Sequence, residues 1–279
     1  MTWRRVTQAD VPLVEAFLKR HIETSVFLVT NLRRYGPDGG PEAYAMTYWM
    51  TGDPVSGVIA QSTTGTVMAQ WPDAGDWAKA AAVLPAPVTG VIADGDQMQA
   101  FLATTGLTTA PTMLDADETL YALDLADLNA QPGPAQLRAL TDADRGILVP
   151  WRTDYAVHTL GEPENTAPAR AEAEITHFIA ARSHRLLVDG EVALSMTGFN
   201  AVVDDLVQVG GVYTPPAERG RGLARRAVAL HLEEARASGG TRAILFANDP
   251  SAMAAYKAVG FHSIGRFRLV TFTNPRVLA

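Results

Sequence analysis

Residues 209–235 read "VGGVYTPPAERGRGLARRAVALHLEEA" and lead from an apolar segment through two prolines into a cluster of glycine and arginine. Valine and tyrosine favour a strand at the start, and apolar residues recur at helical spacing after Gly222. Cations are disfavoured in the first turn of a helix, because unpaired amides already make that end partly positive. The arginines around this turn therefore predict a bound polyanion, which amides at Gly220 and Gly222 can approach closely. A solvated arginine-rich helix face remains the alternative.

Two well-known phosphate-binding motifs do not fit this stretch. A dinucleotide-binding turn requires G-x-G-x-x-G after a strand, and the third glycine is missing after "GRG". The P-loop pattern G-x-x-x-x-G-K-[ST] occurs nowhere in the chain.

The stretch instead resembles the GNAT acyltransferase superfamily, whose signature R/Q-x-x-G-x-G/A is matched by Arg219 to Ala224. Downstream, "AILFANDPSAMAAYKAVGFHSIGRF" is similar to the closing strand, helix and strand of that family. The family pattern N…A…Y…GF is met there by Asn248, Ala252, Tyr256, Gly260 and Phe261. Two motifs in the right order make this resemblance specific.

The chain shows the same order of elements twice. "QLRALTDAD" near residue 136 parallels "TWRRVTQAD" near the N-terminus, and "NAQPGPAQ" between the halves has the composition of a linker. The resemblance therefore implies an α/β protein of two GNAT-like domains in tandem, each a mostly antiparallel, twisted mixed sheet flanked by helices. We expect a degenerate N-terminal domain at 1–130 and a catalytic acetyltransferase domain at 135–279. Chance similarity of two strand-helix openings is the alternative.

By the same resemblance, acetyl-CoA is the expected co-substrate, and no metal is expected. Backbone amides of residues 220 to 224 would hold its pyrophosphate, with added charge from Arg219 and Arg221. The strand backbone at Gly211, Val212 and Tyr213 would pair with the pantetheine arm. Asn248 would bind near the pantetheine, although a turn or an N-cap is an alternative for it. The expected cofactor-binding residues are Gly211, Val212, Tyr213, Arg219, Gly220, Arg221, Gly222, Leu223, Ala224 and Asn248.

Two catalytic roles follow from the expected reaction. Attack of an amine on a thioester releases a thiolate, and the family tyrosine matched by Tyr256 would protonate it, since a phenol with a pKa near ~10 carries its proton at neutral pH. A buried aromatic on an amphipathic helix is the alternative for Tyr256. The general base is less determined, and Glu162 is nominated. The remaining candidates are Asp154, His158, Asp204 and Asp205. The segment with Trp151, Tyr155 and His158 falls where family members contact their acceptors.

The N-terminal half lacks the cofactor motif. Its segment "WPDAGDWAKA" carries aspartates where a phosphate would be repelled, and Phe101 stands near the position of the tyrosine acid. We expect this half to shape the acceptor site or an interface. The helix "HIETSVFLVTNLRRYG" is expected to pack in a core rather than bind a ligand.

Composition limits the other function classes. The net charge of −7 argues against general affinity for nucleic acid or an anionic membrane. The chain has no cysteine, which excludes thiolate nucleophiles and zinc-thiolate sites. No segment reads as a signal peptide or a membrane span, so a cytoplasmic protein is expected. A homodimer stays open.

The sequence thus predicts an N-acetyltransferase that moves an acetyl group from acetyl-CoA to a primary amine, in a small molecule or a peptide, by direct attack. A non-catalytic acyl-CoA sensor module is the alternative, and a binder of another phosphorylated ligand is a third reading.

Overall fold

The computed structural model describes residues 2–278, whose contacts divide the chain into two compact units. The first unit consists of Met1–Leu120 with Gly265–Ala279, and the second of Tyr121–Ile264. Among residues 2–278, no helix is both long and apolar enough to cross a lipid bilayer. The division at Gly265 places most of the C-terminal strand in the first unit, whereas the sequence-based division assigned this strand to the second.

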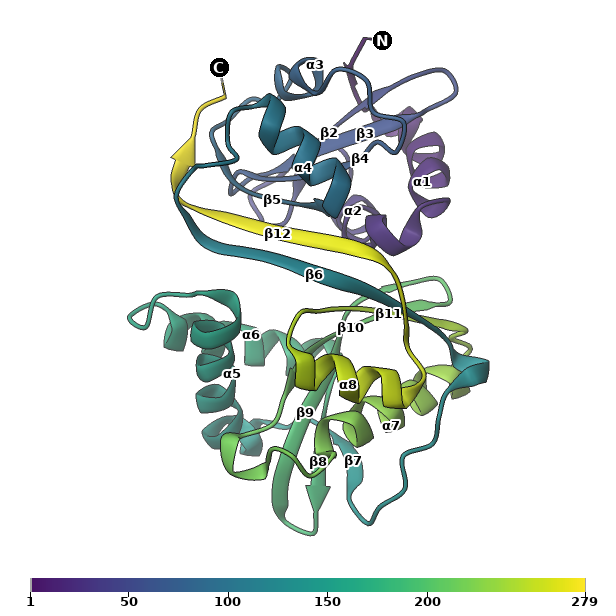
Figure 1. Cartoon of the computed structure of the whole chain (residues 1–279), viewed down its shortest axis with the longest axis vertical. Helices are drawn as coiled ribbons and strands as arrows, with labels where there is room; N and C mark the ends of the chain where they lie inside the picture. Colours follow the sequence, from purple (N-terminus) through teal and green to yellow (C-terminus); the bar gives the residue numbers. More distant parts are fainter. Residues whose placement is uncertain (1, 279) are drawn as a thin grey trace. The chain divides into compact units, whose positions relative to one another are not determined.

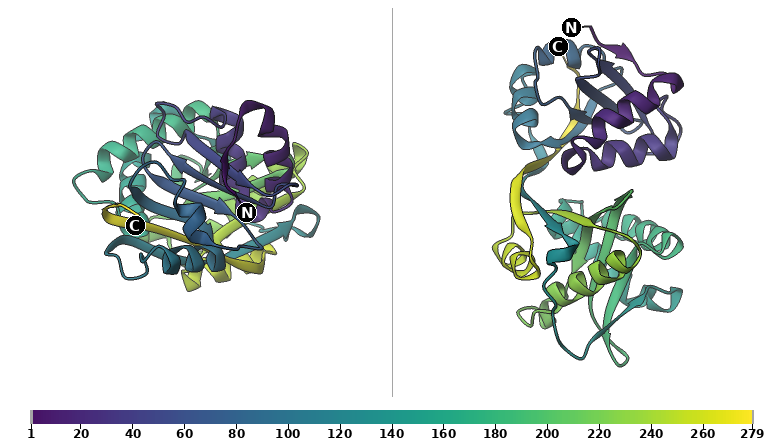
Figure 2. Two further views of the ribbon diagram at one scale, coloured as in Figure 1. Left: turned by 90° about the horizontal axis from the view of Figure 1, so that it is seen from above. Right: turned by 90° about the vertical axis from the view of Figure 1, so that its right-hand side faces the viewer.

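The first unit is a twisted sheet with helices on both faces (Figures 1 and 2). Its strand order is β1-β2-β3-β4-β5-β12-β6, in which β4 and β5 pair in parallel and the pairs β1–β2, β2–β3, β3–β4 and β5–β12 are antiparallel. Its elements are β1 (Arg4–Arg5), α1 (Val11–Lys19), α2 (Ile22–Tyr35), β2 (Met46–Thr51), β3 (Gly57–Ser62), β4 (Thr66–Gln70), α3 (Trp77–Ala81), β5 (Val88–Asp94), α4 (Gly95–Thr104) and β6 (Thr112–Asp124).

The second unit repeats this plan, with strand order β6-β11-β10-β9-β8-β7 and a parallel pair of β10 and β11. Helices α5 and α6 lie on one face of its sheet and α7 and α8 on the other (Figure 2). Its elements are β7 (Gln136–Ala139), α5 (Arg145–Leu160), α6 (Ala167–Ala181), β8 (His184–Asp189), β9 (Val192–Val203), β10 (Leu206–Tyr213), α7 (Leu223–Ala237), β11 (Arg242–Ala247) and α8 (Pro250–Val259). The last strand, β12 (His262–Arg276), starts in this unit and belongs to the first unit from Gly265 onward.

Charge pairing helps to explain why β12 joins the first unit. β12 is hydrogen-bonded to β5 from Phe267 onward and lies between β5 and β6 in the sheet. Arg268 binds Asp115 of β6 through two contacts of 2.8 Å, and Arg266 pairs with Asp117 next to it. Opposite charges on neighbouring strands favour this register. The sequence pattern alone did not reveal these partners.

The strand-to-helix opening of the first unit is fixed by one carboxylate. The carboxylate of Asp10 accepts hydrogen bonds from both terminal nitrogens of Arg4, at 2.6 and 2.8 Å. It also accepts hydrogen bonds from the amide and the hydroxyl of Thr7, at 2.9 and 2.7 Å. These bonds satisfy donors that the start of a helix leaves open.

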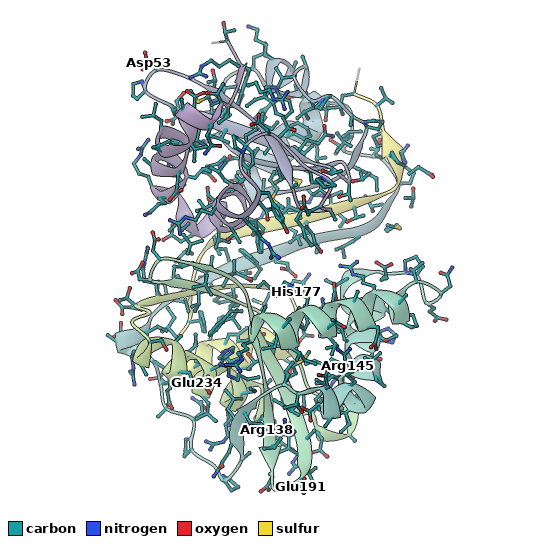
Figure 3. All side chains as sticks on the ribbon, turned by 180° about the vertical axis from the view of Figure 1, so that it is seen from behind. Asp53, Arg138, Arg145, His177, Glu191 and Glu234 are labelled. Carbon is teal, nitrogen blue, oxygen red and sulfur yellow. The ribbon has the colours of Figure 1, made fainter. Side chains whose placement is uncertain are left out.

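The second unit opens with the same set of contacts. The carboxylate of Asp144 accepts hydrogen bonds from both terminal nitrogens of Arg138, at 2.7 and 2.8 Å. It also accepts hydrogen bonds from the amide and the hydroxyl of Thr141, each at 2.8 Å. Figure 3 labels Arg138 on β7. The parallel between "TWRRVTQAD" and "QLRALTDAD" therefore extends to individual hydrogen bonds, which supports a duplicated plan.

Candidate active site

Strands β10 and β11 separate along their length. They pair in parallel only from Leu206 to Gln208, opposite Arg242 to Ile244, while β10 stays paired with β9 as far as Tyr213. On the side of β10 that faces β11, no strand among residues 2–278 is hydrogen-bonded to β10 beyond Gln208. The backbone from Val209 to Tyr213 therefore presents an open strand edge within the second unit, where an extended ligand can add as a strand.

A bulge interrupts β10 on this open stretch. Its register with β9 shifts between Gly210 and Tyr213, and Gly211 has φ of +62°. A Cβ at Gly211 would lie 2.7 Å from Nε2 of His184, and a Cβ at Gly210 would overlap the side chain of Asn200. Both glycines are therefore required by the bulge rather than by the loop that follows it.

His184 is the side chain that fills the space beneath the bulge. It is 1% exposed, stacks on Phe178 with ring centroids 3.6 Å apart, and shares a hydrogen bond of 2.9 Å with Ser183 through Nδ1. Burial, together with the nearby Arg152 guanidinium, lowers the pKa of His184 well below its ordinary value. The imidazole is therefore neutral, and its ring fills the space beside Gly211 and supports the bulge in β10.

The loop after β10 delivers the chain to an uncapped helix. A short turn at Pro216–Glu218 precedes two glycines in the left-handed region, Gly220 at φ +78° and Gly222 at φ +75°. Gly222 is the N-cap of α7, which has neither a capping side chain nor an acidic residue in its first turn. The first amides of a helix have no partner within it, so this terminus is a ready site for an anion.

Three of the arginines surround this terminus. Arg219 donates from Nε to the carbonyl of Thr214 at 3.0 Å, and Arg221, whose side chain is 59% exposed, pairs with Glu218. The Arg225 side chain lies over Gly222, where a Cβ would come 2.8 Å from its Nε. Positive charge is thus held beside the open amides of α7.

Arg226 has a different role. Its guanidinium donates to the carbonyl of Ala135, at 2.6 and 2.9 Å, and also to the carbonyl of Gln131. It therefore fastens the segment between β6 and β7 to α7. The sequence pattern grouped Arg226 with the anion-facing arginines, and its carbonyl partners show why that grouping does not hold for this side chain.

Asn248 and Tyr256 lie beyond β11, before and within α8. Asn248 is exposed, and the N-cap of α8 is Asp249, which accepts the amide of Ala252 at 2.8 Å, so the N-cap alternative for Asn248 is wrong. Tyr256 is 9% exposed and belongs to the apolar cluster that includes Val209 of β10. Helix α8 therefore places the phenol in the same core as the open strand.

Glu162 belongs to an ion-pair network that joins α5 to α6. It pairs with Arg170 at 2.6 Å and accepts the hydroxyl of Thr166 at 2.6 Å. Arg170 also binds Glu174 at 3.0 Å, and Glu174 pairs in turn with the buried Arg152. The Thr166 hydrogen bond and the Arg170 ion pair hold the pKa of Glu162 below its ordinary value, which makes it a weaker base.

Asp154 lies next to the end of β10. Its Oδ2 accepts the hydroxyl of Tyr213 at 2.9 Å, and its Oδ1 is 3.4 Å from Nε2 of His158. Trp151 packs on Tyr213 with ring centroids 5.6 Å apart. Burial and the Asp154 hydrogen bond raise the pKa of Tyr213 to about 12, so the phenol stays a neutral donor. Sequence reasoning gave Tyr213 a backbone role only and missed this side-chain contact.

Asp204 and Asp205 form the turn between β9 and β10, at the opposite end of β10 from Tyr213. Asp205 binds the hydroxyl of Thr241 and lies 3.7 Å from Arg242. Asp205 therefore holds the start of the parallel strand pair, and both aspartates lie away from the open edge.

Comparison with known proteins agrees with this geometry. Residues 147–261 match the family model described as the acetyltransferase (GNAT) family. This region is a GNAT-family domain. Members of this family use acetyl-CoA as co-substrate, and the match indicates a transferase acting on an acceptor substrate. No curated protein sequence matches the chain.

Solved structures extend the GNAT fold to the whole chain. A GNAT-family acetyltransferase from Colwellia psychrerythraea is 13% identical, with a TM-score of 0.55 over 98% of this chain and 100% of its own. A GCN5-related N-acetyltransferase from Sphaerobacter thermophilus is 14% identical, with a TM-score of 0.59 over 99% and 97%. A tandem GNAT protein from the clavulanic acid biosynthesis pathway is 16% identical, with a TM-score of 0.57 over 99% of each chain. The chain thus has two GNAT-like folds in tandem.

Proposed function

We propose that this protein is an acetyl-CoA-dependent N-acetyltransferase that acts on a primary amine. The observation that carries the proposal is the open edge of β10, which leads directly into the uncapped, glycine-rich start of α7. An extended arm that ends in phosphates needs both features, a strand edge and an anion site, in this order along the chain. We further propose a cytoplasmic location and leave a homodimer open.

Three places in the chain support the proposal that it binds acetyl-CoA. Amides from Gly220 to Ala224 would bind the pyrophosphate, aided by the charges of Arg219 and Arg221 and by Leu223 at the helix start. The edge of Gly211, Val212 and Tyr213 would pair with the pantetheine arm. Asn248, exposed at the end of β11, would bind the same arm. The proposed reaction uses no metal ion.

Acetyl-CoA would supply the thioester, and this chain would supply position and a proton. Tyr256 is the proposed acid for the departing thiolate, because α8 holds it in the core that backs β10. The amine attacks directly, since no cysteine exists to carry the acetyl group. Glu162 was nominated as base, but its ion pair with Arg170 favours a structural role, and Asp154 is better placed.

The two units have different proposed roles. We propose a single active site in the second unit, while the first is a degenerate copy that lacks the cofactor features. A sensor module without turnover would keep the same loop, so turnover has to be measured separately from binding.

Calorimetric titration with acetyl-CoA, CoA, ATP and NAD tests the cofactor. We expect acetyl-CoA and CoA to bind, and Gly220→Asp to weaken this binding at least ~10-fold by placing a carboxylate among the phosphate-binding amides. Gly106→Asp is the matched control, because both glycines have positive φ, +78° and +70°, and open space where a Cβ would stand. Equal binding of all four ligands, or an unchanged Gly220→Asp, would contradict the proposal.

A further inference from the structure

A cavity of about 520 Å³ lies between α5 and the start of α6 in the second unit. Its apolar wall includes Val149, Val157 and Pro168, and its polar wall includes Asp154, His158 and Glu164. The proposed cofactor site uses none of these residues. The cavity is open to solvent, so a ligand other than the cofactor can enter it.

The charge of the lining is negative. Asp154 and Glu164 are carboxylates, and none of the described lining residues is lysine or arginine. The nearest cations on these helices, Arg152 and Arg170, are already paired with Glu174 or Glu162. A cation that enters the cavity is attracted by Asp154 and Glu164, whereas a carboxylate is repelled by them.

Tyr213 connects this cavity to the open strand. Its ring is buried at the end of β10, and its hydroxyl donates to Asp154 at 2.9 Å. The hydrogen bond fixes one carboxylate oxygen, and the other faces His158 at 3.4 Å. A group bound to Asp154 is therefore held beside the last residue of the strand on which the thioester would lie.

We propose that this cavity binds the acceptor, and that the acceptor is a cationic amine with an aliphatic body and no carboxylate. The proposal rests on the proposed function. Asp154 binds the ammonium group and then accepts one of its protons, so that the neutral amine can attack the thioester carbonyl. Tyr213 orients Asp154, and the apolar wall covers the carbon chain. The second carboxylate, Glu164, sets the preference against zwitterions and acids.

Cadaverine and lysine form a matched pair of probes, because they differ only by the α-carboxylate. Release of CoA is followed with a thiol-reactive chromophore, which has no protein background because the chain lacks cysteine. We expect kcat/KM for cadaverine to exceed that for lysine by at least ~10-fold, from one unpaired, repelled charge. Calorimetry of both amines in the presence of CoA gives the same comparison without turnover.

Asp154→Asn should lower cadaverine kcat/KM by about 10- to 100-fold, through both KM and kcat, since it removes a charge-assisted bond to the ammonium group and the acceptor of its proton. Glu164→Gln, an exposed change with little effect on folding, should narrow the cadaverine-to-lysine ratio. Glu191→Gln is the control, because this exposed residue lies in the β8–β9 turn outside the cavity (Figure 3).

The outcomes separate the two proposals. If acetyl-CoA binds and Gly220→Asp weakens it, but cadaverine shows no preference over lysine in turnover or binding, the cavity inference is wrong and the cofactor assignment stands. If acetyl-CoA does not bind, the proposed function itself fails. A preference for cadaverine that survives Asp154→Asn and Glu164→Gln would also overturn the inference.

Discussion

The two units treat their parallel strand pair in opposite ways. In the first, β4 pairs with β5 from Thr66 to Ala69, which is almost its whole length. In the second, β10 pairs with β11 only over its first three residues and then leaves an open edge. The same fold therefore gives a strand pair that is closed along its length in one case and an open strand edge in the other. What separates them is where the pairing stops.

Local sequence explains the closed form. Trp71 follows β4 directly, donates its amide to Gln97 at 2.5 Å, and packs edge-on against Trp77 with ring centroids 5.0 Å apart. Trp77 in turn packs on Phe101 at 5.8 Å. Helix α3 is capped by Asp76, which accepts the amide of Ala78 at 3.1 Å. After its parallel strand, the first unit has packed aromatic side chains and a helix with an acidic cap. The second unit has glycines and a helix without a capping side chain at the corresponding place.

The largest effect should come from altering the β10 bulge at Gly211. Gly211→Ala should lower the free energy of unfolding by about 2–4 kcal/mol, because positive φ and the contact with His184 both oppose a Cβ. Chemical denaturation measures this, and acetyl-CoA binding should weaken with it. Gly190→Ala is the control, with φ of +57° but open space for its Cβ. If both variants lose the same free energy of unfolding, the contact between His184 and the β10 bulge does not restrict residue 211.

The next effect concerns Tyr256, because the N-terminal half has Phe101 near the matching position. Tyr256→Phe should lower kcat by about 10²-fold or more with acetyl-CoA affinity unchanged, since it removes the proposed proton donor but keeps the ring. Tyr44→Phe, on a side chain that is 61% exposed, is the control. A loss in kcat of less than about threefold would exclude the acid role.

Acid should destabilise the second unit before the first. Burial lowers the pKa of His231 to about 3, so below the ordinary histidine value the unfolded chain binds a proton that the folded chain does not. Stability is then lost as pH falls from about 6.5 toward 3, by up to about 1.4 kcal/mol per pH unit. His231→Phe, which can keep the stacking on Phe199, should flatten this slope in urea titrations. An unchanged slope would contradict a neutral, buried His231.

The smallest effect compares the two helix openings. The Arg138 ion pair and the Thr141 hydrogen bonds lower the pKa of Asp144 to about 2, so its stabilisation is present above about pH 4 and is lost as pH falls through about 2. Asp144→Asn should cost about 1–2 kcal/mol at neutral pH. Asp10→Asn should cost less, because Arg4 is more exposed than Arg138, at 53% against 42%. The reverse order would mean that exposure does not set the difference.

Local sequence predicted the features that are themselves local. The strand at β10, the glycine turn and the helix α7 could be predicted because valine, tyrosine, glycine and periodic apolar residues each favour one conformation. The GNAT family and the mixed sheet were confirmed. The assigned roles of Tyr256, Glu162 and the loop residues stay predictions.

Features that depend on distant partners could not be predicted in the same way. Arg226 resembles its neighbours in sequence, yet its carbonyl partners lie in a segment about a hundred residues earlier. Glu162 looks like a solvated acid until α6 brings Arg170 against it. The hydrogen bond from Tyr213 to Asp154 likewise depends on how α5 packs on the sheet.

The position of β12 has a consequence for the order in which the molecule can be made. β12 lies between β5 and β6, yet it follows all the strands of the second unit along the chain. A ribosome therefore releases all strands of the second unit before the strand that completes the first. Until then, the first unit has a gap in its sheet, with the facing edges of β5 and β6 unpaired. The unit that starts first is finished last, and a fragment ending before β12 would lack an interior strand.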